Sequence, residues 1–134
     1  TDFDQSYYFP IETISIPDIK GNKANYIYSK TYTGNGKLYG YFNVPGYVSN
    51  PPDYVNDKSM QTFEIDVYNK TVKKMNFDGT TGWSCSQCKA GDYMVFGMAS
   101  TQGTGYYLYN YKEDKYEPLK IKTEGNPFKI QYLK

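Results

Sequence analysis

The feature that most constrains the fold is a fifteen-residue pattern that occurs twice, 44 residues apart. Residues 63–77 (FEIDVYNKTVKKMNF) align without gaps with residues 107–121 (YLYNYKEDKYEPLKI). Each copy alternates apolar and polar residues, is interrupted by a polar turn (Asn69-Lys70 or Glu113-Asp114), and then resumes. Alternation with period two on both sides of a turn predicts a β-hairpin. The chain therefore contains the same predicted hairpin twice.

Two more candidate strands precede each hairpin. Residues 36–44 and 91–99 both open with Gly, and residues 24–33 and 82–88 lie before them. Four antiparallel strands in about 44 residues are typical of a β-propeller blade. The alternative is a β-sandwich, in which short strands also recur at regular spacing. We expect a single all-β unit over residues 1–134, with repeat 1 at about residues 21–79 and repeat 2 at about 80–134.

The composition supports this fold class. Tyr, Ile, Val, Phe and Thr together number 49, whereas Ala and Leu together number 7. β-Branched and aromatic residues favour strands, and Ala and Leu favour helices. The 134 residues are enough for one domain with a core of its own.

The absent residue types exclude several functions. The chain has no His, so it lacks a Ser-His-Asp or Cys-His nucleophile pair and histidine metal ligands. All 15 basic residues are Lys and the net charge is +1, which does not indicate a nucleic-acid partner. We expect a protein that is not an enzyme and that needs neither a metal nor a cofactor. The chain starts without a signal peptide or an amino-terminal Cys, as expected of a mature or processed chain, so export stays open.

Two blades do not close a propeller, because closure normally takes four to eight. A pair alone also leaves exposed strand edges, which promote aggregation. If the blade interpretation holds, we expect the chain to belong to a larger ring or to pair with a second chain.

The repeats differ by one insertion. The opening Gly and the hairpin are 27 residues apart in repeat 1 and 16 apart in repeat 2, and the excess lies at residues 45–59. Three Pro residues and many small polar residues predict a surface loop there, and long loops on a rigid scaffold often bind ligands. A small ligand or glycan would stack on Tyr47 and Tyr54, with Asp53 and Lys58 supplying charge. A merely tolerated insertion is the alternative.

A CxxC motif, Cys85 to Cys88, is the second candidate feature. Zinc needs four ligands, which this chain does not supply without further Cys or His. We expect a local disulfide, with two free thiols as the alternative. Trp83, just before the motif, is either a rigid hydrophobic tip or part of the core, and the turn around Trp83 and Lys89 is a second candidate binding region.

The chain also resembles a known family, through TGNGKLYGYF at residues 33–42, TFEIDVYNKTV at 62–72, GDYMVF at 91–96, YLYNY at 107–111 and IQYLK at 130–134. These segments are similar to the C-terminal part of the β-propeller surface lipoproteins of Gram-negative gut-type anaerobes, a family long described as a domain of unknown function. The resemblance implies location at the cell surface, outer membrane or periplasm. It also implies association with a TonB-dependent outer-membrane transporter and, in some members, binding of ferric siderophores.

Taken together, these observations predict a ligand-binding surface or periplasmic protein that serves as an accessory for nutrient or iron-siderophore capture. The alternative is a structural or adhesive β module that binds protein or glycan through its tyrosine-rich faces, since amphipathic Tyr is well suited to wet interfaces.

Overall fold

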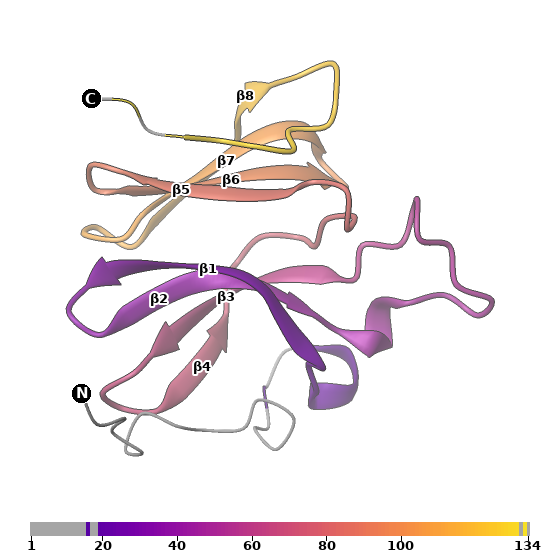
Figure 1. The fold of residues 1–134 in the computed structure, drawn as a ribbon, viewed down its shortest axis with the longest axis horizontal. Coiled ribbons are helices and arrows are strands. Elements are labelled where there is room, and N and C mark those ends of the chain that lie inside the picture. The colour runs from indigo at the N-terminus through magenta and orange to yellow at the C-terminus, as the bar shows by residue number, and fades with distance from the viewer. Residues whose placement is uncertain (1–15, 17–18, 132, 134) are drawn as a thin grey trace.

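The structure, a computed structural model, describes residues 16, 19–131 and 133. It consists of two antiparallel sheets of four strands, in which each strand pairs with the next along the chain (Figure 1). The first sheet comprises β1 (Tyr26–Gly34), β2 (Lys37–Asn43), β3 (Met60–Asp66) and β4 (Thr71–Lys74). The second comprises β5 (Cys85–Ala90), β6 (Tyr93–Ser100), β7 (Gly103–Asn110) and β8 (Lys115–Lys122). The predicted all-β fold is confirmed.

Among the described residues, helix is limited to two 3-10 turns of three residues each, η3 (Lys20–Asn22) and η4 (Pro45–Tyr47). Within the described part of the chain there is accordingly no helix with the length and apolar character needed to cross a membrane.

Both predicted hairpins are present, and their turns use the same chemistry. Asp66 Oδ1 accepts a hydrogen bond from the backbone N–H of Asn69 at 3.0 Å, and Asn110 Oδ1 accepts one from that of Glu113 at 3.1 Å. The next residues, Lys70 and Asp114, have positive φ angles of 54° and 52°. Asx side chains stabilise such turns by bonding their own backbone a few residues on. The repeat therefore extends to the turn geometry, not only to the alternation of the strands.

Strand register shows how the two sheets correspond. The pair Leu38–Ile65, which joins β2 to β3, is equivalent to the pair Met94–Tyr109, which joins β6 to β7. Leu38 and Ile65 face away from the second sheet and pack with Ile16 and Ile19, whereas Met94 and Tyr109 face the first sheet. Equivalent faces of the two sheets thus point in the same direction. The sheets are stacked head to tail.

The main core lies between the sheets. Tyr41 on β2 is completely buried and makes an edge-to-face contact with Phe96 on β6, with ring centroids 5.6 Å apart. Its hydroxyl donates to the backbone carbonyls of Ser86 at 2.9 Å and Gly97 at 3.2 Å. A buried hydroxyl needs such partners, because leaving it unpaired costs more than a hydrogen bond contributes. Tyr41 therefore joins the sheets through both ring packing and hydrogen bonding.

Candidate functional site

One end of the first sheet carries a row of three side chains on the face toward the second sheet. Tyr26 pairs with Asn43 across β1 and β2, and Asn43 pairs with Met60 across β2 and β3. Cross-strand neighbours in an antiparallel sheet project on the same side. The register thus places residues from three strands side by side at the point where the predicted insertion leaves β2 and rejoins β3.

The insertion has an ordered interior. Its base is closed by a hydrogen bond of 2.9 Å from the N–H of Val44 to the carbonyl of Ser59. Asp57 Oδ2 accepts from the backbone N–H of Ser49 at 2.9 Å, from the Ser49 hydroxyl at 3.1 Å and from the backbone N–H of Asp53 at 3.0 Å. These donors, the Ser49 N–H foremost, lower the pKa of Asp57. The carboxylate therefore holds the loop in one form and positions Tyr54.

The segment between the sheets supplies the opposite wall. Thr80 exchanges two backbone hydrogen bonds with Met60, of 2.8 and 3.1 Å. The Thr80 hydroxyl donates to the Ser84 carbonyl at 2.9 Å and accepts from the Ala99 N–H at 2.8 Å. These four bonds anchor the turn that presents Trp83, which remains 59% exposed. Of the two expectations for Trp83, the exposed hydrophobic tip is correct and the core position is wrong.

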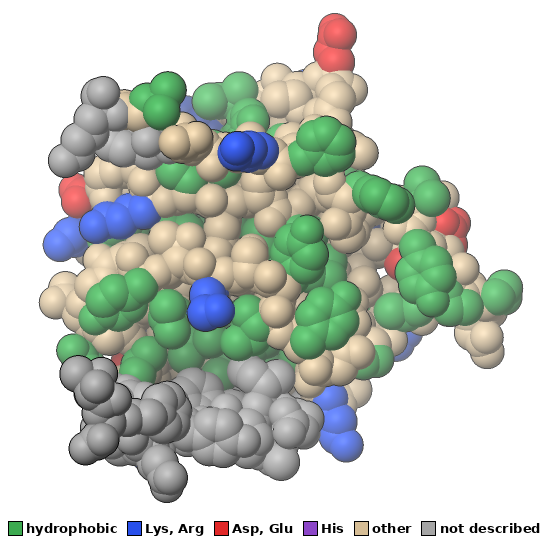
Figure 2. Space-filling view, in the orientation of Figure 1, with side chains coloured by type: hydrophobic (Ala, Val, Ile, Leu, Met, Phe, Trp, Pro, Cys, Tyr) green, Lys and Arg blue, Asp and Glu red, His purple; other side chains and the backbone are tan. Residues whose placement is uncertain are grey.

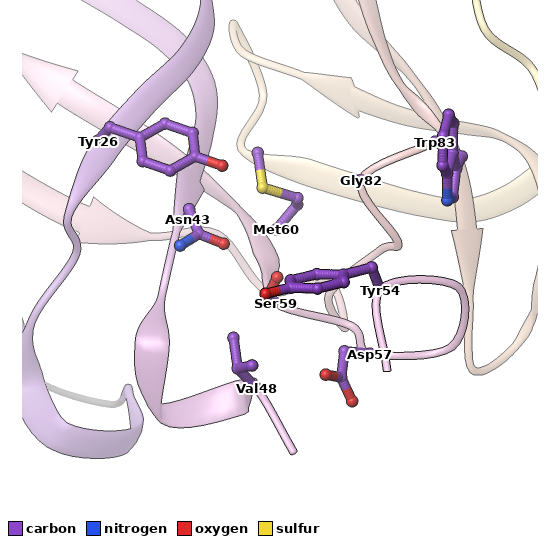
Figure 3. Close-up of a pocket in the computed structure, with 9 residues that line it drawn as sticks. All are labelled: Tyr26, Asn43, Val48, Tyr54, Asp57, Ser59, Met60, Gly82 and Trp83. Carbon is purple, nitrogen blue, oxygen red and sulfur yellow. The ribbon is translucent and has the colours of Figure 1, made fainter. Parts of the chain in front are cut away.

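These elements enclose a pocket of about 440 Å³, called here the aromatic pocket (Figure 3). Its lining residues are Tyr26, Asn43, Val48, Tyr54, Asp57, Ser59, Met60, Gly82 and Trp83. Tyr26, Tyr54 and Trp83 project from three separate segments around it and are 50%, 74% and 59% exposed. Asn43, Asp57 and Ser59 add polar atoms to the lining. Exposed rings with interspersed hydrogen-bonding groups are suited to flat, hydroxyl-bearing ligands.

The predicted site residues are only partly brought together. Tyr54 and Trp83 both line the aromatic pocket. Asp53 instead caps the loop, accepting from the N–H groups of Val55 and Asn56, and its pKa is lowered chiefly by the Asn56 side chain.

The other three predicted residues lie outside the lining of the aromatic pocket. Tyr47 is half-buried against the core on the far side of the first sheet. Lys58 contributes its carbonyl to the Gln61 amide at 2.9 Å. Lys89 lies over the ring of Tyr111, 5.9 Å from its centroid.

Sequence reasoning missed Tyr26, Asn43 and Met60, because their proximity depends on strand register. It also missed Val48, Asp57 and Ser59, although all three lie inside the predicted insertion. The insertion indicated the correct segment of the chain. Its internal hydrogen bonds determine which of its side chains face the aromatic pocket, and these bonds could not be predicted from its composition.

The predicted disulfide is wrong, since both cysteines have free thiols. They lie three residues apart on one extended strand, β5, which separates their Cα atoms by about 10 Å, whereas a disulfide requires less than about 7 Å. Their side chains also lie on opposite faces: Cys85 is in the core, and Cys88 pairs with Val95 on the other side. Burial raises the pKa of Cys85 to about 12. The thiol of Cys85 is thus a core group of low reactivity.

A polar cluster lies at the other end of the first sheet. Lys37 Nζ is 3.1 Å from Glu64 Oε1 and 3.0 Å from Asp66 Oδ2, and the Tyr39 hydroxyl donates to Glu64 Oε2 at 2.9 Å. Burial foremost, then the Glu64 carboxylate, raises the pKa of Tyr39. The ring of Tyr39 packs against Tyr109 of the second sheet, with centroids 5.7 Å apart. This cluster therefore ties the two sheets together at the end away from the aromatic pocket.

Comparison of the chain with protein-family models, with curated proteins and with solved structures finds no match.

Proposed function

We propose that this chain is a non-enzymatic ligand-binding protein, and that the aromatic pocket binds a sugar ring of a neutral glycan or a small ligand of similar shape. The observation that carries the proposal is the convergence of three exposed aromatic rings on one pocket. Exposed rings that gather around one pocket indicate a binding site more strongly than single exposed rings do, and stacking on a ring face is a common use of them.

The polar groups of the pocket favour a neutral ligand. Asp57 contributes a carboxylate to the wall, and its lowered pKa keeps it ionised at neutral pH. The lining contains no Lys, so nothing there offsets that negative charge. Asn43 and Ser59 offer hydrogen-bonding groups that match sugar hydroxyls. An anionic ligand, such as a ferric siderophore, would be repelled by Asp57 at this site.

We also propose that the two sheets are consecutive blades of a larger propeller. The head-to-tail stacking supports this, because blades follow one another with equivalent faces in the same direction, whereas the two sheets of a sandwich meet through their inner faces.

The resemblance noted above supports a place at the cell surface or in the periplasm. There the protein would act as an accessory in nutrient capture beside an outer-membrane transporter.

Trp83 is the only Trp of the chain, so its fluorescence reports directly on the aromatic pocket. The test titrates the protein with neutral oligosaccharides of several linkages and, separately, with a ferric siderophore. We expect a saturable emission change with at least one oligosaccharide. Tyr54→Ala should weaken that binding about 5- to 150-fold, as expected when a stacking ring worth about 1–3 kcal/mol is lost.

Tyr32→Ala is the matched control, because Tyr32 is similarly exposed but lies near the other end of β1. Its affinity should equal that of the wild type. Binding of the siderophore alone would overturn the neutral-glycan proposal. Equal effects of the two Ala variants, or no emission change with any oligosaccharide, would overturn the placement of the site.

A further inference from the structure

A second site lies where the edges of the two sheets meet. β1 is the edge strand of the first sheet, β5 is the edge strand of the second, and the two strands are in contact. The C-terminal segment runs along the other side of β5 (Figure 1). Residues 29–31, 85–87 and 128–130 from these three segments line an open depression of about 270 Å³, called here the edge groove.

The strand edge in this groove has no backbone partner. β5 pairs with β6 alone, and among the residues that the structure describes no backbone hydrogen bond joins β5 to β1 or to residues 125–131. Unpaired N–H and C=O groups along an exposed edge are a template for another strand. Proteins use such edges to bind extended peptides by β-augmentation.

Two polar side chains of the groove also lack partners. The Ser29 hydroxyl and both polar atoms of the Gln87 amide are shielded from solvent and have no hydrogen-bond partner among the described residues. Most buried polar groups in native proteins have a hydrogen-bond partner, and a bound peptide is one partner that these groups could take. A carboxamide both donates and accepts, and a peptide main chain offers the complementary C=O and N–H.

The charge of the groove indicates the sequence of the peptide. Lys30 and Lys129 lie on opposite sides of β5, both exposed, and no acidic residue lines the groove. Figure 2 shows this face with lysine side chains among hydrophobic ones and no acidic side chain in its middle part. Phe128, which is 72% exposed, adds an apolar contact beside Lys129. The depression is too shallow and small for a typical drug-sized ligand, whereas an added strand needs only an open edge.

We propose that the edge groove binds an extended acidic peptide of a partner protein, which pairs with β5 as an additional strand. The main chain of the peptide pairs with the free edge of β5 and with the Gln87 amide. Acidic side chains on one face of the added strand lie toward Lys30, and acidic and apolar side chains on its other face lie toward Lys129 and Phe128. This function is separate from ligand binding in the aromatic pocket.

The test uses an acetylated, amidated, fluorescently labelled peptide of seven residues, Glu-Glu-Val-Val-Glu-Glu-Val, which as a strand carries glutamate and valine on both faces. Fluorescence anisotropy should show saturable binding to the full chain. A peptide with lysine in place of glutamate should bind at least about 10-fold more weakly, because two exposed charge pairs change from attractive to repulsive. A peptide that is N-methylated at every residue should not bind, because it cannot donate along either strand edge.

Three protein variants locate the site. The double variant Lys30→Glu, Lys129→Glu should lose affinity about 10-fold. The matched double variant Lys115→Glu, Lys122→Glu, on the opposite edge strand β8, makes the same change in charge and should bind as the wild type. Gln87→Met should weaken binding about 3- to 10-fold through loss of the amide hydrogen bonds. It should not lower the unfolding midpoint, because it removes an unpaired polar group.

Several results would overturn the proposal: no binding of the glutamate peptide, equal binding of the N-methylated peptide, or equal effects of the two double variants. A concentration-dependent dimer that Lys30→Glu, Lys129→Glu dissociates would show that a second copy occupies the edge, and would also overturn it.

Discussion

The junction between the sheets can be tested by removing a single oxygen atom. Tyr41→Phe keeps the ring in contact with Phe96 and deletes the hydroxyl that donates to the carbonyls of Ser86 and Gly97. One buried hydrogen bond contributes about 0.5–1.5 kcal/mol net. Because the apolar packing is unchanged, we expect the free energy of unfolding to fall by about 1 kcal/mol. In a domain of this size that corresponds to a melting temperature lower by about 3–5 °C.

The assay is urea unfolding followed by circular dichroism and by Trp83 fluorescence, combined with calorimetry. Tyr28→Phe is the control, since Tyr28 is 57% exposed and belongs to neither core cluster. It should unfold at the wild-type midpoint. Both probes should follow a single transition with an unchanged denaturant dependence, because the main core is shared by the two sheets. Equal midpoints for Tyr41→Phe and Tyr28→Phe, or separate transitions for the two probes, would refute this reasoning.

Two further predictions concern individual groups. The pKa of Asp66 is lowered to about 2, first by the Asn69 backbone N–H, then by the Asn69 side chain and Lys37. Its contribution to stability is therefore complete above the unfolded pKa of about 4 and is lost as the pH falls through about 2. Asp66→Asn gives the first hairpin the residue that the second hairpin has at the equivalent position, Asn110. The free energy of unfolding of this variant should fall less between pH 4 and pH 2 than that of the wild type. An equal fall in the two proteins, measured by urea unfolding at several pH values, would contradict this. For the cysteines, maleimide at pH 7 should label Cys88 in the native protein and Cys85 only after unfolding. Mass spectrometry measures the rate at each cysteine, and equal rates at Cys85 and Cys88 in the native protein would disprove this.

The hairpins were predictable from the sequence because the interactions that define them are local. Alternation sets which side chains share a face, and the Asx residues at 66 and 110 bond their own turns. The positive φ angles at Lys70 and Asp114 fall at the same place in each copy. Such features act over a few residues, so the 44-residue repeat was sufficient to place them. The loop at residues 45–59 was predictable for the same reason, from its Pro residues and its length.

The binding site depended on contacts between distant segments. Tyr26, Asn43 and Met60 meet only through the register of three strands, and a shift of one residue would turn each to the other face. Trp83 is exposed because Thr80 bonds to β3 and to Ala99, and neither bond is visible in the local pattern. The extended conformation of β5 likewise separated two cysteines whose spacing had indicated a bridge. Local hydrogen-bonding and alternation were thus determined by the sequence alone, whereas register and the stacking of the sheets decided which side chains meet, because those depend on the packing of the whole core.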